Sequence, residues 1–296
     1  MAYGGDFFAV EATYTLDNGN TMAVQLSYES GRKSLKLDGV LNRQLSSLVS
    51  MVKVIYLAPD DVQLVNGSPR LRRQYFDMAI SQLFPEYLVT LRQYLHVVDQ
   101  RNALLKQDFS SAQKAVWDQR FAEKLCEVYA FRKRYLEIFN TAFRESYANI
   151  SESFLGLRVE YRSLLKDAFG ADEERVLAAL DEIKGREKTW QRTLVGSHLD
   201  DYSFRFGEHS LRAFASGGQK RMAVIILKLV QAALVQELTN IHPVMLFDDI
   251  FAELDTEHSH RIRELCGKRF QSIIASPKAD IRDIFIDYPV ISPGAE

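Results

Sequence analysis

The sequence predicts an α/β protein in which two strand-containing segments flank a mainly helical block. Residues 7–37 alternate apolar and polar side chains, which indicates strands. Residues 69–195 instead carry apolar side chains at every third or fourth position, which indicates amphipathic helices. Short strands and helices alternate again after residue 196. We therefore expect three domains: strands in 1–68, a helical arm in 69–195, and a second α/β part in 196–296.

The composition is that of a globular protein without a dominant charge. The 296 residues include 37 Lys and Arg and 39 Asp and Glu, so any contact with nucleic acid must come from a local patch. Cys126 and Cys266 lie far apart in sequence, so we expect no disulfide framework and a reducing cytoplasm. The most apolar run, residues 223–235, contains Lys228 and Gln231 and is shorter than the roughly 20 residues of a membrane span, so no membrane partner is expected.

The N-terminal strands are expected to form an antiparallel meander. Residues 8–14 and 22–28 alternate in polarity, turn signals lie at residues 17–20 and 30–32, and the run ends at Asp38-Gly39. Residues 49–58 are apolar almost throughout, which predicts a strand buried on both faces. Pro59 breaks this strand.

The helical block begins with a capping signal. Ser68 suits the N-cap position and Pro69 the first helical position. Helical spacing then continues to about residue 106 with a break near Pro85, and a long amphipathic segment covers residues 111–148. We expect a short strand at residues 157–161 and a further helix at residues 172–194.

The C-terminal part mixes strands and helices. A hairpin is predicted from two strands, residues 202–206 and 210–214, around Gly207. Ser216 opens a strongly apolar helix that runs to about Leu238. A buried strand at residues 244–247, a polar helix at 257–269 and a last strand at 272–275 complete the prediction.

One helix start could hold a phosphate. In Ser216-Gly217-Gly218-Gln219, two glycines let a backbone approach an anion closely. The serine hydroxyl and the free N–H groups of the helix start could then cradle a phosphate. The alternative is a plain serine N-cap after a turn.

Two acidic segments follow at the predicted strand end. Asp248 and Asp249 end the strand of residues 244–247, where adjacent carboxylates can hold Mg²⁺ and orient a water molecule. Asp255 closes the Ala-Glu-Leu-Asp loop of residues 252–255, which could reach the nucleotide of a second subunit. The alternatives are two solvated aspartates and a helix N-cap at Asp255 or Thr256.

The order of these motifs resembles that of ABC-type ATPases. A Ser-Gly-Gly-Gln helix start, a strand ending in two acids some thirty residues later, and a Leu-Asp loop follow one another. The resemblance implies an SMC- and Rad50-like ATPase head with an inserted helical arm. Residues 1–68 would be a remnant of lobe I, 69–195 the arm subdomain of lobe II, and 196–296 the lobe that holds the signature, the Walker B strand and the D-loop.

Further strings make the chain similar to the RecF family of bacterial recombination mediators. They are Pro59-Asp60-Asp61-Val62, Gly67-Ser68-Pro69, Arg72-Arg73, Phe76-Asp77, Gln100-Arg101-Asn102-Ala103-Leu104-Leu105-Lys106, Gly196-Ser197-His198-Leu199-Asp200-Asp201 and Phe214-Ala215-Ser216-Gly217-Gly218-Gln219. The resemblance covers nearly the whole chain. Transporter ATPases share the Ser-Gly-Gly-Gln turn but lack the arm strings, so a transporter subunit is a weaker interpretation.

The resemblance implies a cytoplasmic protein of DNA repair, replication and recombination that binds DNA in an ATP-dependent manner. Family members form head-to-tail dimers around two ATP molecules and help load recombinase at single-strand gaps with other mediator proteins. By motif, Ser216, Gly217, Gly218 and Gln219 would contact the γ-phosphate bound by the other subunit. Asp248 would bind Mg²⁺ through water, the catalytic Asp249 would orient the attacking water, and Asp255 would lie at the dimer interface.

This sequence departs from the family pattern at three places. The family's Q-G-Q-Q after the signature serine reads G-G-Q-K here, and its G-P-H-R-D-D reads G-S-H-L-D-D. The P-loop, G-x-x-x-x-G-K-[ST], is missing, because the only Gly-Lys pair is Gly267-Lys268 and Arg269 follows it. By analogy with the family we expect that the chain begins some fifty residues too late. Either it is N-terminally truncated, or the P-loop comes from another chain, or the head has lost ATPase activity. We expect that this chain alone neither binds ATP tightly nor hydrolyses it.

The candidate DNA contacts are arginines. Arg70, Arg72 and Arg73 cluster at a helix start and could bind phosphates or stabilise the fold. For Arg132-Lys133-Arg134 we favour solvated faces and internal ion pairs, and for His198 a structural hydrogen bond. The partners expected are single-stranded or gapped duplex DNA, a second copy of the chain, and other mediators. The alternative function is a nucleotide-independent DNA- or protein-binding module on a degenerate ABC head.

Overall fold

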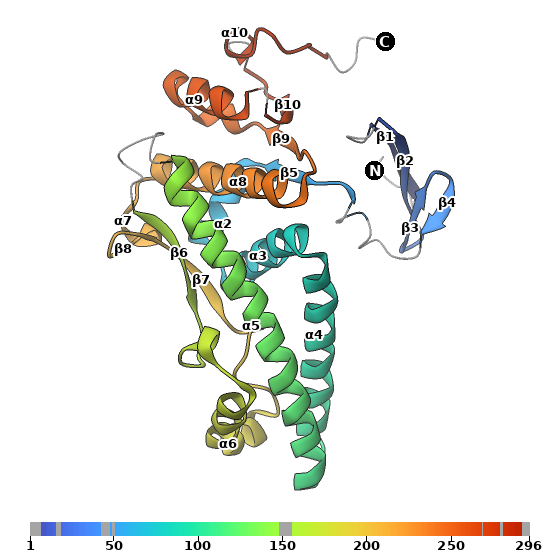
Figure 1. Ribbon diagram of the computed structural model, residues 1–296, viewed down its shortest axis with the longest axis vertical. Helices are drawn as coiled ribbons and strands as arrows, with labels where there is room; N and C mark the ends of the chain where they lie inside the picture. The colour runs from blue at the N-terminus through green and yellow to red at the C-terminus, as the bar shows by residue number, and fades with distance from the viewer. Residues whose placement is uncertain are drawn as a thin grey trace.

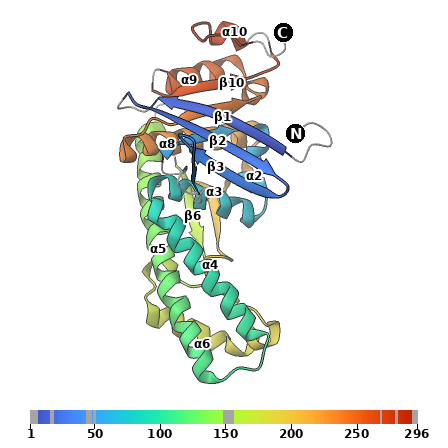
Figure 2. The same ribbon diagram turned by 90° about the vertical axis from the view of Figure 1, so that its right-hand side faces the viewer.

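The computed structural model describes residues 7–15, 19–42, 48, 51–147, 156–267, 269–278 and 281–291. Figure 1 shows a head built around helix α8 (Gly217–Thr239) and a long arm that extends away from it. Helices α4 (Pro85–Leu105) and α5 (Ser111–Tyr147) lie side by side along this arm in both views (Figures 1 and 2).

The predicted N-terminal meander is confirmed. Four antiparallel strands are paired in sequence order, β1 (Phe7–Thr15), β2 (Thr21–Glu29), β3 (Arg32–Leu37) and β4 (Val40–Asn42). Met22, Val24 and Leu35 are buried on one face. Strand β4 was not predicted, because Asp38 (φ 48°) and Gly39 (φ 79°) form a tight hairpin turn instead of ending the sheet. Of the predicted first turn, residues 17 and 18 lie outside the described residues.

A parallel three-stranded sheet joins the two ends of the sequence. Its order is β10 (Gln271–Ala275), β9 (Val244–Asp248) and β5 (Val54–Leu57). The prediction of one strand over residues 49–58 was wrong in length, since β5 has four residues, while residues 49 and 50 lie outside the described residues. It was also wrong in burial. Strand β5 is an edge strand, and Tyr56 is 49% exposed.

The helical block matches its capping signals. Helix α3 (Pro69–Leu83) begins at Pro69, and α4 begins at Pro85 after the predicted break. Ser68 holds the N-cap position of α3, but its side chain accepts no hydrogen bond there. Asp172 caps α6 (Glu173–Trp190), which ends four residues before the predicted end because Gln191 adopts the left-handed conformation. Two short helices, η1 (Pro59–Val62) and α2 (Gln63–Asn66), lie between β5 and α3.

A third sheet connects the arm to the C-terminal part. It is antiparallel, with the order β6 (Leu157–Arg162), β7 (Asp201–Phe206) and β8 (His209–Ser210). The predicted second hairpin strand over residues 210–214 was wrong, because the chain enters the helical turn α7 (Leu211–Phe214) directly after β8 and buries Leu211. The three predicted domains thus share sheets, and their boundaries remain a proposal.

Helix α8 forms the centre of the core. It is the one helix in the described part of the chain that is long and apolar enough to cross a membrane, yet 78% of its apolar window is buried inside the protein, as in the core helix of a soluble protein. Its two polar interruptions have partners. Lys228 pairs with Asp61 and donates to the Tyr56 carbonyl at 2.5 Å, and Gln231 accepts from Tyr75 at 2.6 Å. These contacts fix α8 against β5 and the base of the arm.

The remaining elements are short or lie beyond β9. They are η3 (Ala168–Gly170), η4 (Ile250–Glu253), α9 (Thr256–Cys266) and α10 (Ile281–Ile284). Helix α9 ends three residues before its predicted end, at Gly267, whose φ of 37° interrupts the helix. The strands predicted at residues 157–161, 244–247 and 272–275 are confirmed as β6, β9 and β10.

Candidate functional site

The start of α8 is a solvent-exposed turn with its own cap. Ser216 Oγ accepts a hydrogen bond from the Gln219 N–H at 3.2 Å, and Gln219 Oε1 accepts one from the Ser216 N–H at 2.9 Å. This reciprocal arrangement is a capping box. A Cβ atom added at Gly217 or Gly218 would meet nothing within 4 Å. The first turn of α8 is therefore open to an approaching anion, as the phosphate interpretation requires.

Replacing Ser216 separates its capping role from any role toward a ligand. We expect Ser216→Ala to lower the free energy of unfolding by about 1 kcal/mol, because the Gln219 N–H loses its acceptor. Ser68→Ala is the matched control, since Ser68 holds an N-cap position without a side-chain hydrogen bond and should cost close to zero. Urea unfolding of both variants measures this, and equal losses would contradict the role of the capping box.

The end of β9 presents the two predicted aspartates in different surroundings. Asp248 is exposed and accepts a hydrogen bond from the Tyr56 hydroxyl at 2.6 Å. This bond raises the pKa of Tyr56, because it favours the protonated phenol. Asp249 adopts φ 51°, its N–H donates to the Ala275 carbonyl at 2.9 Å, and its Oδ1 is buried without a hydrogen-bond partner among the described residues. Tyr56 was not predicted, since its pairing with Asp248 spans 192 positions of sequence.

These acids fit a magnesium ion only in part. Mg²⁺ keeps several waters and takes one or two carboxylates together with substrate phosphates. Exposed Asp248 and the unpaired Asp249 oxygen supply carboxylates of this kind. Within the described residues no group of three or more His, Cys, Asp or Glu is placed to hold a metal by protein ligands alone. The donor set therefore suits an ion that arrives with a phosphate.

Asp255 caps α9 at the surface. Its carboxylate accepts from the His258 N–H at 2.8 Å and lies 2.7 Å from His258 Nδ1. The backbone hydrogen bond from His258 is the main cause that lowers the pKa of Asp255. The side chain is mostly exposed. The N-cap alternative is thus confirmed, and both carboxylate oxygens of Asp255 lie within hydrogen-bonding distance of His258.

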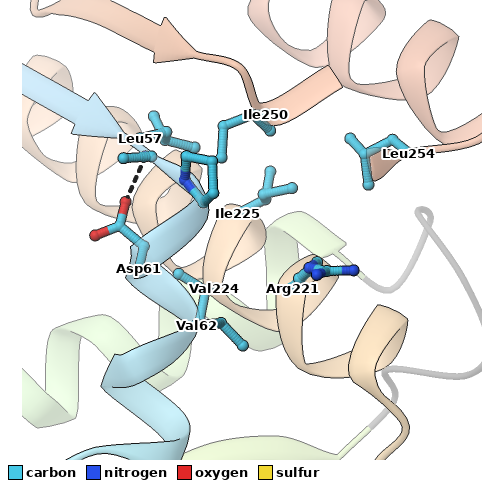
Figure 3. Close-up of a pocket in the computed structure, with 10 residues that line it drawn as sticks. Leu57, Asp61, Val62, Arg221, Val224, Ile225, Ile250 and Leu254 are labelled. Carbon is cyan, nitrogen blue, oxygen red and sulfur yellow. Dashed lines mark hydrogen bonds between the residues drawn. The ribbon is translucent and has the colours of Figure 1, made fainter. Parts of the chain in front are cut away.

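A small, mostly apolar pocket connects the two motif segments (Figure 3). Its walls come from the end of β5 with η1, from α8 and from η4 and the residue after it, and its lining residues are Leu57, Ala58, Pro59, Asp61, Val62, Arg221, Val224, Ile225, Ile250 and Leu254. Arg221 lies two residues after Gln219, and Ile250 directly follows Asp249. The structure therefore brings the neighbours of the α8 start and of the β9 end to one pocket, next to the Pro-Asp-Asp string.

The three arginines of the predicted cluster differ in their exposure to solvent. Arg72 is 5% exposed and binds Asp201 in a bidentate manner at 2.7 and 3.0 Å, with a further bond to the Gly67 carbonyl at 2.9 Å. Its guanidinium is occupied within the chain, so Arg72 stabilises the fold and does not offer a free contact to DNA. Arg73 is partly buried and donates to the Asp200 carbonyl at 2.7 Å, whereas Arg70 is exposed.

Residues of the Gly-Ser-His-Leu-Asp-Asp string make hydrogen bonds to side chains of the arm helices α4 and α5. His198 Nδ1 lies 2.7 Å from the Tyr94 hydroxyl, which confirms the structural hydrogen bond. Burial is the main cause that lowers the pKa of His198 to about 4. Buried Arg132 donates to the Ser197 carbonyl at 2.9 Å and pairs with Asp77 at 2.8 Å, as the internal alternative for this cluster predicts.

The chain is similar in sequence to curated proteins of known name. A relative in Symbiobacterium thermophilum, named DNA replication and repair protein RecF, is 31% identical over 275 residues, which are 90% of this chain and 73% of the relative. A relative of the same name in Geobacter sp. strain M21 is 31% identical over 272 residues, 91% of this chain and 74% of the relative. No protein-family model matches the chain.

A solved structure described as the recombination mediator protein RecF with ATP superposes with a TM-score of 0.83 at 24% identity, over 94% of this chain and 76% of that one. A second, of RecF with ATPrS, superposes with a TM-score of 0.82. At this identity the likeness concerns the fold, and it confirms the predicted fold class, an ABC-type ATPase head with a helical arm.

Proposed function

Since the chain belongs to the RecF family of DNA replication and repair proteins, we propose that it acts in recombination-linked repair by binding DNA under the control of ATP. In this proposal it binds single-stranded or gapped duplex DNA in the cytoplasm, pairs with a second copy of itself around ATP, and helps other mediator proteins to load recombinase.

The observation that carries the proposal is the pairing of an open helix start with an unpaired carboxylate in one head. The start of α8 leaves Gly217 and Gly218 uncovered, and Asp249 keeps a buried oxygen without a partner among the described residues. A fold optimised only for stability would satisfy that oxygen, because an unpaired buried acceptor costs about 1–3 kcal/mol. Such an orphan is typical of a site that waits for a ligand.

Each motif residue then has one role. Ser216, Gly217, Gly218 and Gln219 would touch the γ-phosphate of a nucleotide held by the partner subunit. Asp248 would hold Mg²⁺ through water, Asp249 would orient the water that attacks the phosphate, and Asp255 would contact the partner. Bound Mg²⁺ would supply positive charge to the phosphate oxygens.

The residues present do not form the cradle for the β-phosphate. Among the 296 residues no P-loop occurs, and Gly267-Lys268 has no glycine at the required distance before it. Without the backbone nest and its lysine, the main anion-binding element of such heads is missing. We therefore propose that these 296 residues alone neither bind ATP tightly nor hydrolyse it.

ATP binding and hydrolysis test this proposal. The chain is compared with a chimera that carries the strand, P-loop and helix of a RecF relative ahead of residue 7. We expect ATP binding and turnover in the chimera and neither in the chain, by equilibrium dialysis with labelled ATP and by phosphate release. Tight ATP binding by the chain itself, or a folded chimera that binds no ATP, would contradict the proposal.

A second candidate is a DNA- or protein-binding module that works without nucleotide. The hydrogen bond from Tyr56 to Asp248 favours it, because the hydroxyl occupies an oxygen that Mg²⁺-bound water would need. The two candidates differ in one measurement. DNA binding by the chimera that is unchanged by ATP would support this second function, and DNA binding that rises with ATP would support the first.

A further inference from the structure

The far end of the arm is held together by one buried arginine. Arg101, near the end of α4, is fully buried and donates to Glu187 of α6 and to Asp118 of α5, both at 2.8 Å. A further bond runs to Thr193 at 2.9 Å. In Figure 2, α6 accordingly lies beside the lower ends of α4 and α5. Three helices therefore meet at a rigid tip, some distance along the arm from the head.

Both tryptophans of the chain lie at this tip. Trp117 directly precedes Asp118, and Trp190 follows Glu187 by three residues, which places each within about one helical turn of the Arg101 cluster. Each carries an arginine over its ring, Arg120 at 5.2 Å from Trp117 and Arg192 at 5.6 Å from Trp190. Trp190 is 62% exposed. A large aromatic surface is therefore held out to solvent on a stiff support.

The charge around Trp190 is positive. Five exposed cations of the tip make no ion pair with another described residue, namely Lys106, Arg120, Arg186, Lys188 and Arg192. Three nearby acids are already paired, Glu187 and Asp118 with Arg101 and Asp181 with Lys184. Asp99 of α4, Asp108 of the following loop, and Glu173, Glu174 and Glu182 of α6 form no ion pair with another described residue, and Glu173 accepts a hydrogen bond from Gln119. Within four residues of Trp190, however, the exposed cations are Arg186, Lys188 and Arg192, and the one acid, Glu187, is already paired with Arg101. This local excess of positive charge favours an anionic partner.

We propose that this tip, with Trp190 at its centre, binds single-stranded DNA. An unpaired base would stack on the exposed indole ring, and the flanking arginines and lysines would contact the phosphates on either side. Arg186 lies four residues before Trp190 on the same helical face, and Arg192 lies over the Trp190 ring, so both cations are close to the indole. A duplex would offer phosphates but no open base face for the ring. The inference deepens the proposed function, since it rests on DNA binding and names the strand and the surface.

Tryptophan fluorescence tests the tip directly. In Trp117→Phe, emission comes from Trp190 alone, because the chain has two tryptophans. Titration with an oligo-dT strand should quench this emission, and Trp190→Ala should weaken oligo-dT binding by about 10-fold in fluorescence anisotropy. Trp190→Phe, which keeps an aromatic ring, should recover most of the affinity. The titration needs no nucleotide, because the tip residues lie on the arm and not at the motifs of the head.

Salt dependence supplies a readout that a purely structural role would leave unchanged. Arg192→Gln should reduce the slope of log affinity against log salt by about 0.7, the value for one phosphate contact on a single strand. Arg144→Gln is the matched control, since it removes an exposed charge near the other end of α5 and should leave the slope unchanged.

The outcomes separate this inference from the proposed function. Oligo-dT that binds without quenching Trp190 would overturn the tip site and leave DNA binding elsewhere on the chain intact. Absence of any DNA binding, by the chain and by the ATP-loaded chimera, would overturn both. Quenching of Trp190 by another mediator protein but not by DNA would assign the tip to a protein partner and overturn the inference as well.

Discussion

Arg101→Met should lower the free energy of unfolding by about 3–5 kcal/mol. The guanidinium of Arg101 and the carboxylate of Glu187 are both fully shielded from solvent. Removing only the cation leaves a buried carboxylate without its charge partner, although Glu187 Oε1 still accepts a hydrogen bond from the Leu194 N–H at 3.1 Å. The loss is measurable by urea unfolding followed by circular dichroism.

Two control variants make this expectation specific to burial. Arg101→Met combined with Glu187→Leu removes both charges and should recover much of the lost stability, because the unpaired carboxylate is gone. Arg175→Met breaks the exposed pair with Asp167 and should cost no more than about 1 kcal/mol. A loss from Arg101→Met as small as that from Arg175→Met would contradict the account of the arm tip.

The local features of the fold were predictable because their signals are local. Proline at the first helical position marks both α3 and α4, and the serine before two glycines marks α8. Alternation predicted the meander correctly. The failures occur where tertiary context overrides a short pattern. Residues 210–214 alternate like a strand, but burial of Leu211 turns them into α7. Residues 49–58 are uniformly apolar, yet only four of them pair with β9.

The candidate site also has features that the sequence predicted and features that it did not. The position of Asp248 and Asp249 followed from the rule that polar residues end parallel strands at the ligand edge. The contact of Tyr56 with Asp248 did not, because no sequence pattern links residues so far apart. For Arg72, the sequence suggested a contact that the structure does not offer. A cluster of arginines suggested phosphate contacts, but the bidentate partner Asp201 comes from a strand 129 positions later and withdraws Arg72 from the surface.

Asp249→Asn in the P-loop chimera should reduce ATP turnover by roughly 100- to 10,000-fold, the range for loss of a group that orients or activates an attacking water. The amide has nearly the same shape as the carboxylate, and the backbone bond from residue 249 to Ala275 is unaffected. ATP affinity should therefore stay close to that of the parent chimera. Phosphate release and equilibrium dialysis measure the two quantities separately.

The free energy of unfolding of Asp249→Asn shows whether the loss of turnover comes from the reaction or from a destabilised head. Because Oδ1 of Asp249 has no hydrogen-bond partner among the described residues, Asp249→Asn breaks no hydrogen bond at that atom and should leave the free energy of unfolding unchanged or raise it. Asp283→Asn, at an exposed position of α10, is the matched control and should leave both turnover and stability unchanged. Turnover lost together with stability would instead mean that Asp249 supports the head, and turnover retained by a stable variant would remove Asp249 from the reaction.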